Sequence, residues 1–369
     1  MQPPPAQPGM MVDQVETPAL LIDLDAFEHN LDRMADLLRP TGARLRAHAK
    51  THKSPVIAHQ QIARGAVGQC VQKIAEAEIL AWGGVADILV SNEVVGDAKL
   101  ARLVALRRLA QVAICADDPR HVARIEAAAA AAGTRQTVLV EIDAGMGRCG
   151  VAPGPAAVAL AQQIAASPHL IFGGLQSYHG PAQHLRSRDE REAAIAGTVE
   201  NTRRTIEQLR QQGLSCAIVG GGGTGSFEIE AASGVFTEIQ AGSYCFMDAD
   251  YRRNSGGASD GFKQSLFVLA TVMSAARPRV AVLDAGHKAV AIDSGFPLVW
   301  GRGDIRYTGA SDEHGKLEWL EDAGATLGEK LWLVPGHCDP TVDRFDWYVG
   351  VRGSRVECVW PVAARGALQ

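Results

Sequence analysis

Between residue 45 and about residue 245, short apolar runs alternate with longer runs rich in Ala, Leu, Arg and Glu. The apolar runs have the length and composition of β-strands. The longer runs have helical character, and several end at glycine, as helix C-termini often do. Strands that alternate with helices indicate a parallel sheet. The eight strand candidates cover residues 45–50, 68–73, 87–92, 111–117, 137–144, 172–180, 216–223 and 237–244.

Eight such units within roughly 250 residues have the size of a closed (β/α)8 barrel of the TIM type. We favour this α/β architecture over an open, doubly wound sheet. After about residue 260 the helical runs stop, and short β-branched runs with turns between them predict a mostly β second domain. We therefore predict an N-terminal arm and strand over 1–22 that joins the β domain, a barrel over 23–259 and the β domain over 260–369. A helix is expected over 25–39, with Asp25 as its N-cap.

Composition and charge exclude several classes of protein. The formal net charge is -5 and aromatic residues make up 5%, so neither a basic patch nor base stacking indicates a nucleic-acid partner. The seven cysteines are scattered without a CxxC pair, which argues for a reducing compartment. The N-terminus "MQPPPAQPGMMVDQ" lacks the features of a signal peptide, and no apolar run approaches the roughly 20 residues of a membrane helix. We expect a soluble cytoplasmic protein that binds no membrane.

The segment "RLRAHAKTHKSP", residues 44–55, alternates two imidazoles with an amine. In a strand, His48, Lys50 and His52 would all point to one side. A solvated basic edge is the simplest interpretation. The alternative is a lysine whose pKa is lowered by its surroundings, so that its amine forms a Schiff base.

Polar and glycine residues gather at the predicted carboxyl ends of the strands, where barrel enzymes place their chemistry. The run "VGGGGTGS", 219–226, and the pair Gly242 and Ser243 are suited to bind a phosphate beside Lys50, although a tight turn also explains the glycines. A lysine next to a phosphate site suggests pyridoxal phosphate. The pattern GxGxxG occurs twice without the context of a dinucleotide fold, so we discount NAD.

The late segment "PGHCDPTVD" places His337 two residues before Asp339. An imidazole and a carboxylate on one face are a plausible pair of ligands for a divalent metal, with Cys338 facing away. A surface turn before a proline is the alternative interpretation.

Together these motifs resemble those of the D-threonine aldolases and the related D-serine dehydratases, which are fold-type III pyridoxal-phosphate enzymes with an alanine-racemase-like barrel. The resemblance extends over nearly the whole chain, from "TPALLIDLDAFEHNL" through "HAKTHKSP", "EIDAGMGRCGV", "LQSYHG" and "GGGTGS" to "PGHCDPT". It implies that the cofactor is bound by Lys50, Gln72, Arg148, Tyr178, Gly222, Gly223, Thr224, Gln240, Gly242, Ser243 and Tyr244.

The resemblance also implies individual roles. Lys50 would hold the cofactor, Arg148 would lie near its phenolic oxygen, and Gln240 would lie beside its pyridine nitrogen. Tyr178 would pack near the ring. The four residues Gly222, Gly223, Thr224 and Gly242, together with Ser243, would surround the phosphate.

The His-x-Asp spacing resembles that of the aldolases, because the dehydratases carry His-x-Cys. It implies a metal held by His337 and Asp339, with Mn²⁺ favoured and Mg²⁺, Co²⁺ or Zn²⁺ as alternatives. The implied reaction is retro-aldol cleavage of a D-β-hydroxy-α-amino acid, such as D-threonine, to glycine and an aldehyde. His52, His179 or a metal-bound water would act as the base, or the two histidines would only orient other groups.

The resemblance implies a homodimer as well, in which Asp312 and His314 of the second domain line the substrate entrance. Three other functions stay open at this point. The nearest is a dehydratase of D-serine or D-threo-3-hydroxyaspartate. A racemase is less favoured because its reaction does not need a pair of metal ligands. A non-catalytic pyridoxal-phosphate carrier is the least favoured function.

Overall fold

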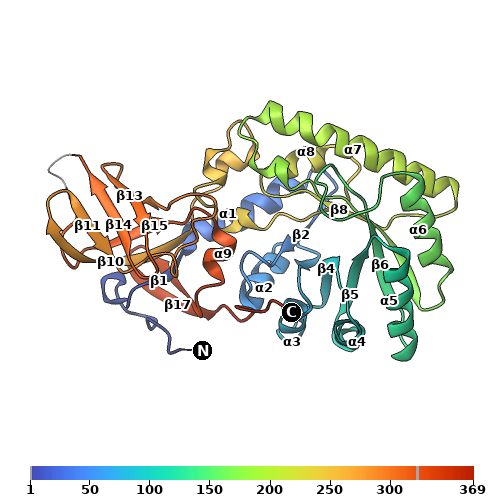
Figure 1. The fold of residues 1–369 in the computed structure, drawn as a ribbon, viewed down its shortest axis with the longest axis horizontal. Helices are drawn as coiled ribbons and strands as arrows, with labels where there is room; N and C mark the ends of the chain where they lie inside the picture. The colour runs from blue at the N-terminus through green and yellow to red at the C-terminus, as the bar shows by residue number, and fades with distance from the viewer. Residues whose placement is uncertain (1, 321–323) are drawn as a thin grey trace.

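The fold consists of a barrel and a β-sheet domain that lie side by side, at the right and left of Figure 1. This computed structural model describes residues 2–320 and 324–369. Residue 1 of the predicted N-terminal arm, and residues 321–323 of the predicted β domain, lie outside the described residues. Among the described residues, no helix has both the length and the apolar character that crossing a membrane requires.

The predicted barrel is confirmed, and the open sheet is wrong. Eight parallel strands close in the order of the sequence, because β2 pairs with both β3 and β9. Each strand is mostly buried, as expected for strands covered by helices on one side and by barrel contents on the other. The strands are β2 (Arg44–His48), β3 (Gly68–Val71), β4 (Asp87–Glu93), β5 (Gln111–Ala116), β6 (Gln136–Glu141), β7 (Leu170–Gln176), β8 (Ile218–Gly221) and β9 (Glu238–Ile239).

Helices cover the outside of the barrel (Figure 1). In α5 the buried face is formed by His121, Val122, Ile125 and Ala129, which recur at helical spacing. The N-cap of α1 is Asp23, whose side chain accepts from the Ala26 N–H, so the expectation of Asp25 is wrong by two residues. The helices are α1 (Leu24–Leu38), α2 (Pro55–Ala63), α3 (Ile74–Trp82), α4 (Asp97–Ala105), α5 (Pro119–Ala131), α6 (Pro155–Ala166), α7 (Arg188–Gln211), α8 (Phe227–Ala232) and α9 (Cys338–Val342).

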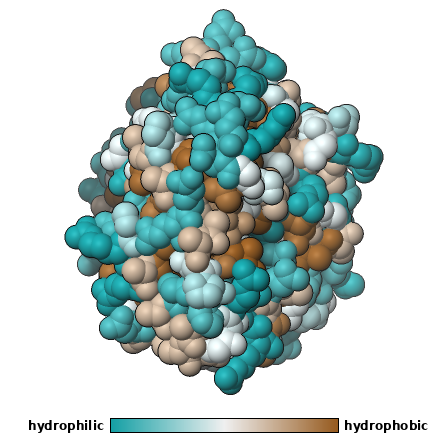
Figure 2. Space-filling view, turned by 90° about the vertical axis from the view of Figure 1, so that its right-hand side faces the viewer, coloured by the Kyte–Doolittle hydropathy of each residue, from teal (hydrophilic) through white to brown (hydrophobic). Residues whose placement is uncertain are grey.

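The end of the molecule formed by the barrel is shown in Figure 2. Hydrophilic residues are spread over this face, and hydrophobic residues appear between them in smaller groups. Such a mixture is typical of the outer sides of helices that bury only one stripe.

The second domain is built on a nine-stranded sheet that contains the N-terminal strand. Strand β1 lies between β10, to which it is antiparallel, and β16, to which it is parallel. The chain therefore starts in the β domain, forms the barrel and returns (Figure 1). The strands are β1 (Ala19–Asp23), β10 (Leu266–Arg277), β11 (Val280–Leu283), β12 (Leu298–Val299), β13 (Ile305–Ala310), β14 (Gly315–Trp319), β15 (Lys330–Val334), β16 (Trp347–Arg352) and β17 (Arg355–Pro361).

A buried ion pair links three barrel strands. The Arg46 guanidinium on β2 donates to Glu238 on β9 at 2.6 Å and to Asp87 on β4 at 2.7 Å, and the Arg46 side chain is only 3% exposed. Removing one partner of such a pair leaves a buried charge without compensation. This pair therefore helps to hold the barrel closed at the seam between β2 and β9.

We expect Arg46→Ala to lower the free energy of unfolding by about 3–5 kcal/mol. Urea titrations followed by circular dichroism would measure the shift. Arg44→Ala is the matched control, because Arg44 contacts the same carboxylate at 3.4 Å from an exposed position, where a pair contributes less than about 1 kcal/mol. Equal losses in the two variants would contradict this role for Arg46.

Candidate active site

A cavity of about 210 Å³ opens at the carboxyl ends of the barrel strands. It brings together nine of the residues expected to bind the cofactor, whereas Gly222 and Tyr244 are not part of its wall. Tyr244 is fully buried, and its hydroxyl accepts from the Gln61 amide. The lining residues are His48, Lys50, Thr51, Gln72, Ser91, Arg148, Gln176, Tyr178, Gly223, Thr224, Gln240, Gly242, Ser243 and Tyr251.

Lys50 lies in a turn after β2, not in the strand. The strand ends at His48 and residues 49–52 form the turn, so the expected two-residue alternation stops before Lys50. The Lys50 Nζ lies 3.1 Å from Asp339 Oδ2 of α9. The negative charge of Asp339 raises the pKa of Lys50, so the interpretation of a lysine with a lowered pKa is wrong.

The two flanking histidines have different surroundings. His48 lines the cavity, and its Nε2 lies 2.9 Å from the side-chain amide nitrogen of Gln72. Burial, together with the positive charge of Lys50, holds the His48 pKa well below its usual value. His52 is fully buried outside the cavity wall, where its Nδ1 accepts from the Ser54 N–H and burial lowers its pKa to about 4. Both imidazoles are therefore neutral at pH 7.

His179 also lies outside the cavity wall. Its Nδ1 accepts from the Ala182 N–H at 3.1 Å, and its Nε2 side faces Gly145. The structure thus brings neither of the histidines expected to act as a base to the cavity that contains Lys50.

The glycine-rich loops fit a phosphate. No acceptor among the described residues takes the backbone N–H groups of Gly223, Thr224, Gly242 or Ser243. A Cβ on Gly242 would lie 2.6 Å from Thr51 Oγ1, a buried hydroxyl in the wall of the cavity. Free backbone N–H groups in a narrow loop are a suitable site for an anion. The residues present therefore fit the phosphate of the expected cofactor.

We expect Gly242→Ala to weaken binding of pyridoxal phosphate by at least about tenfold, because the new methyl group would approach both Thr51 Oγ1 and the His48 carbonyl at 2.7 Å. Fluorescence titration of the cofactor-free protein would measure the dissociation constant. Gly197→Ala is the matched control, since nothing lies within 4 Å of a Cβ at that helical position. Unchanged affinity in Gly242→Ala would show that the loop is wider than the structure indicates.

Two glutamines form a reciprocal pair at the wall of the cavity. Gln176 at the end of β7 and Gln240 after β9 exchange amide hydrogen bonds of 2.7 and 2.8 Å, and both are buried. A Cβ at Gly220 would lie 2.5 Å from the Gln240 amide, so this glycine makes room for the pair. The pairing fixes Gln240, the residue expected beside the pyridine nitrogen.

Arg148 and Tyr178 lie together on another part of the wall. The Arg148 guanidinium lies 6.0 Å from the centre of the Tyr178 ring, within reach of a cation–π interaction. Its nearest carboxylate is Glu141 at 3.9 Å. Burial, followed by the charge of Glu93, raises the pKa of Glu141 to about 8. Burial also raises the pKa of the Tyr178 hydroxyl, which is therefore protonated at pH 7.

The predicted metal ligands lie at the start of α9, which faces the barrel in Figure 1. His337 Nδ1 lies 2.7 Å from Asp293 Oδ2, so Asp293 orients the ring and leaves Nε2 available for a metal. Burial alone would raise the pKa of Asp339, but the charges of Lys50 and His337 outweigh it and hold the pKa below its usual range. An imidazole and an ionised carboxylate fit a divalent cation.

The expectation that Cys338 faces away is wrong. Its Sγ lies 3.4 Å from Asp339 Oδ1, and its N–H donates to Asp248 Oδ2 at 3.0 Å. The reason is that the segment begins a helical turn at Cys338, so the alternation of a strand does not apply. Burial raises the pKa of the Cys338 thiol well above its usual value.

Asp312 and His314 are exposed in the turn between β13 and β14 and do not line the cavity. His48, expected as a neighbour of Lys50, does line it, whereas sequence reasoning missed Thr51, Ser91, Gln176 and Tyr251. Gln176 is the last residue of β7, at the carboxyl end where the polar residues of the other strands gather, so that residue was accessible from the pattern. Tyr251 follows the barrel without any such signal.

The comparisons with known proteins agree with this geometry. The family "Alanine racemase, N-terminal domain" matches residues 22–250, and "Putative serine dehydratase domain" matches residues 265–351. A 3-hydroxy-D-aspartate aldolase of Paracoccus denitrificans (strain Pd 1222) is 46% identical over 369 residues, covering 98% of this chain and 95% of the relative. A D-threonine aldolase of Arthrobacter sp. is also 46% identical over 365 residues, covering 99% and 96%.

Structural similarity extends over the same length. The crystal structure of D-threonine aldolase from Filomicrobium marinum superposes with a TM-score of 0.97 at 49% identity, covering 99% of this chain and all of that one. A D-threo-3-hydroxyaspartate dehydratase of Delftia sp. (strain HT23) is more distant, at 30% identity over 359 residues, covering 90% of this chain and 93% of the relative.

The barrel with its β domain and its lysine-containing cavity defines a pyridoxal-phosphate enzyme of the alanine-racemase-like fold. Within this class, the chain belongs to the D-threonine aldolase family.

Proposed function

We propose that the protein cleaves the Cα–Cβ bond of D-β-hydroxy-α-amino acids such as D-threonine, giving glycine and an aldehyde. The observation that carries this proposal is the 3.1 Å contact between Lys50 and Asp339. It brings an expected metal ligand next to the expected cofactor lysine, which lines the cavity, although the two residues are 289 positions apart in the sequence. A lyase of this kind needs both groups at the same carbon–carbon bond.

When bound, pyridoxal phosphate supplies an electron sink for the bond that breaks. The residues that would hold it are Lys50 at the covalent link, the loops around Gly223 and Ser243 at the phosphate, and Gln240 at the ring nitrogen. The Gln176–Gln240 pair fixes an amide at that last position, and an amide leaves the ring less positively charged than a buried carboxylate would. Arg148 would lie near its phenolic oxygen and Tyr178 near the ring, since both line the same cavity.

A divalent cation on His337 and Asp339 would act as a Lewis acid toward the substrate hydroxyl. Mn²⁺ fits this nitrogen and oxygen donor pair, and Mg²⁺, Co²⁺ and Zn²⁺ remain alternatives to be tested in the same assay. Asp293 would orient His337, and Asp248 would hold the backbone of the loop through the Cys338 N–H. The proposal gives His52 no part in proton transfer, because it is buried outside the cavity wall.

The experiment that tests the proposal is a product analysis. The pyridoxal-loaded protein is incubated with Mn²⁺ and D-threonine, D-phenylserine or 3-hydroxy-D-aspartate, and glycine, aldehyde, 2-oxo acid and ammonia are measured. We expect glycine and the matching aldehyde in equal amounts. Equal amounts of 2-oxo acid and ammonia would establish a dehydratase instead, the second candidate that the Delftia relative supports. Bound cofactor without turnover would support a carrier.

We also propose a homodimer, in which Asp312 and His314 of one chain approach the cavity of the other. Their exposure in the turn after β13 supports this, since nothing in the same chain covers them among the described residues. Light scattering coupled to size-exclusion chromatography would measure the mass of the assembly. A mass equal to that of one 39.1 kDa chain would contradict the proposal.

A further inference from the structure

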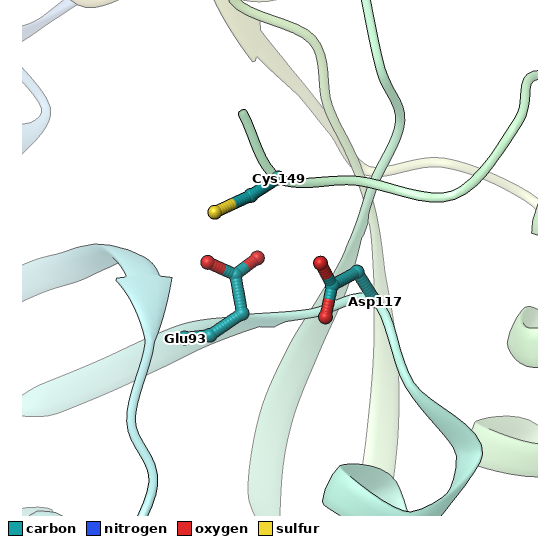
Figure 3. Close-up of side chains that lie close together, drawn as sticks. All are labelled: Glu93, Asp117 and Cys149. Atoms are coloured by element: carbon teal, nitrogen blue, oxygen red, sulfur yellow. The ribbon is translucent and has the colours of Figure 1, made fainter. Parts of the chain in front are cut away.

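A second group of acidic and thiol side chains lies at the barrel mouth, outside the pair formed by His337 and Asp339. Glu93 ends β4, Asp117 follows β5, and Cys149 lies in the loop after β6. One ligand atom of each lies within 4.8 Å of the other two. Figure 3 shows the three side chains pointing toward one another from neighbouring segments of the barrel.

Glu141 is an independent sign that this group lacks a partner. It is the last residue of β6, its side chain is only 5% exposed, and its carboxyl approaches that of Glu93. Its Oε2 is buried and has no hydrogen-bond donor among the described residues, only the neighbouring Glu93 carboxyl, while its Oε1 lies 3.9 Å from the Arg148 guanidinium. A buried polar atom of this kind is expected to have a ligand, because leaving it unsatisfied is unfavourable.

Among the described residues, the Arg148 guanidinium beside Glu141 is the only cation that pairs with this group. Glu93 Oε1 is also buried, and no donor in the described part of the chain hydrogen-bonds to it. Asp117 uses Oδ2 to accept from the Gly150 N–H at 2.9 Å, which leaves Oδ1 free to bind. Among the ion pairs formed by the described residues, none joins Glu93 or Asp117 to a lysine, arginine or histidine. Three carboxylates and a thiol at such short range require protons or a cation to coexist.

We propose that Glu93, Asp117 and Cys149 bind a divalent metal ion, with Glu141 beside Glu93 next to these ligands. One sulfur and two carboxylate donors suit a borderline ion such as Zn²⁺ or Co²⁺, whereas Mg²⁺ and Ca²⁺ prefer oxygen alone. The ligands come from the ends of three consecutive strands, so the ion would tie β4, β5 and β6 together behind Arg148. The inference does not depend on the proposed reaction, because none of these four residues lines the cavity. Only Arg148, which lies 3.9 Å from Glu141, belongs to the cavity wall.

Cobalt tests the site, because a thiolate bound to Co²⁺ gives a charge-transfer band in the near ultraviolet that carboxylates and imidazoles do not. The pyridoxal-loaded protein is stripped with a chelator under reducing conditions, titrated with Co²⁺, and followed by absorption and elemental analysis. We expect the wild type to show the band. We expect Cys149→Ser to lose the band and to bind one Co²⁺ fewer per chain. Cys216→Ser, which changes a half-buried cysteine elsewhere on the barrel, is the matched control and retains both.

Two further variants keep the test decisive. Glu93→Gln preserves the shape of the side chain and the thiol, and we expect it to weaken Co²⁺ binding in the band titration by more than about tenfold. Cys338→Ser separates this site from the His337 and Asp339 pair, because Cys338 is the thiol beside that pair.

A band that persists in Cys149→Ser and disappears in Cys338→Ser would overturn the proposal. So would a wild type that binds cobalt without any thiolate band, in which case the carboxyl groups share protons instead. Since neither readout measures turnover, failure here leaves the aldolase proposal intact.

Discussion

Lys50→Ala is expected to abolish turnover of D-threonine, with kcat/KM at least about 10⁴-fold below the wild type. The expectation follows from the position of Lys50, the lysine in the wall of the cavity that also contains the free N–H groups of the glycine loops. Without its amine, the cofactor has no covalent attachment. We therefore also expect the variant to lose the visible absorption of protein-bound pyridoxal phosphate after dialysis, which measures the attachment separately from catalysis.

Two control variants are informative, and the first distinguishes the effect of the Lys50 amine as a nucleophile from the effect of its positive charge. Lys50→Arg retains a cation next to Asp339 but has no nucleophilic amine, and we expect it to be as inactive as the alanine variant. Lys73→Ala removes a lysine at the start of α3 that does not line the cavity, and we expect normal cofactor content and activity. Borohydride reduction followed by peptide mapping identifies the attached lysine directly. Label on a peptide without Lys50 would contradict the assignment.

The architecture was predictable because it follows from local patterns that repeat along the chain. Eight apolar runs separated by helical runs specify a parallel sheet, and the number of units then sets a closed barrel. Closure places β9 beside β2, so a phosphate site at Gly242 and Ser243 could be placed near Lys50 before any contact was known. The same reasoning located most of the cavity wall, since it depends only on which residues follow each strand.

Local geometry at the strand ends was less predictable. The alternation of His48, Lys50 and His52 was interpreted as a continuing strand, but the chain turns immediately after His48. The turn directs Lys50 toward the cavity and leaves His52 in the packed interior. Cys338 was misplaced for the same reason, because a helical turn has a different period from a strand. A two-residue period is a signal only while the strand lasts.

Contacts between distant segments had no signal in the sequence. The Asp293 carboxylate that orients His337 comes from a loop 44 positions away, and Asp248, which holds the Cys338 N–H, is 90 positions away. Asp293 belongs to no recognisable motif, and Asp248 lies in "EIQAGSYCFMDADY", a segment that shares in the resemblance but does not indicate this contact. The raised pKa of Lys50 also depends on a contact across the two domains, so the sequence alone suggested the opposite direction.

Asp339→Ala is the second variant for which we expect a large effect, namely a loss of about 10³-fold or more in kcat/KM for D-threonine. A Lewis acid contributes several kcal/mol to such a reaction, and tenfold in rate corresponds to about 1.4 kcal/mol. With His337 alone, the cation would have one protein ligand. We expect the wild type to lose activity in EDTA and to regain it with Mn²⁺, whereas the residual activity of Asp339→Ala should be insensitive to both.

The cofactor distinguishes this variant from Lys50→Ala. Asp339 is the main cause of the raised Lys50 pKa, so its removal lowers that pKa and favours the neutral amine that attacks the cofactor aldehyde. We therefore expect Asp339→Ala to retain the visible absorption of bound pyridoxal phosphate while it loses activity. Asp339→Asn, which keeps the size of the side chain but removes its charge, should behave in the same way. Wild-type activity in either variant, with unchanged sensitivity to EDTA, would show that the metal binds elsewhere. In that case the contact between Lys50 and Asp339 would serve only to hold α9 against the barrel.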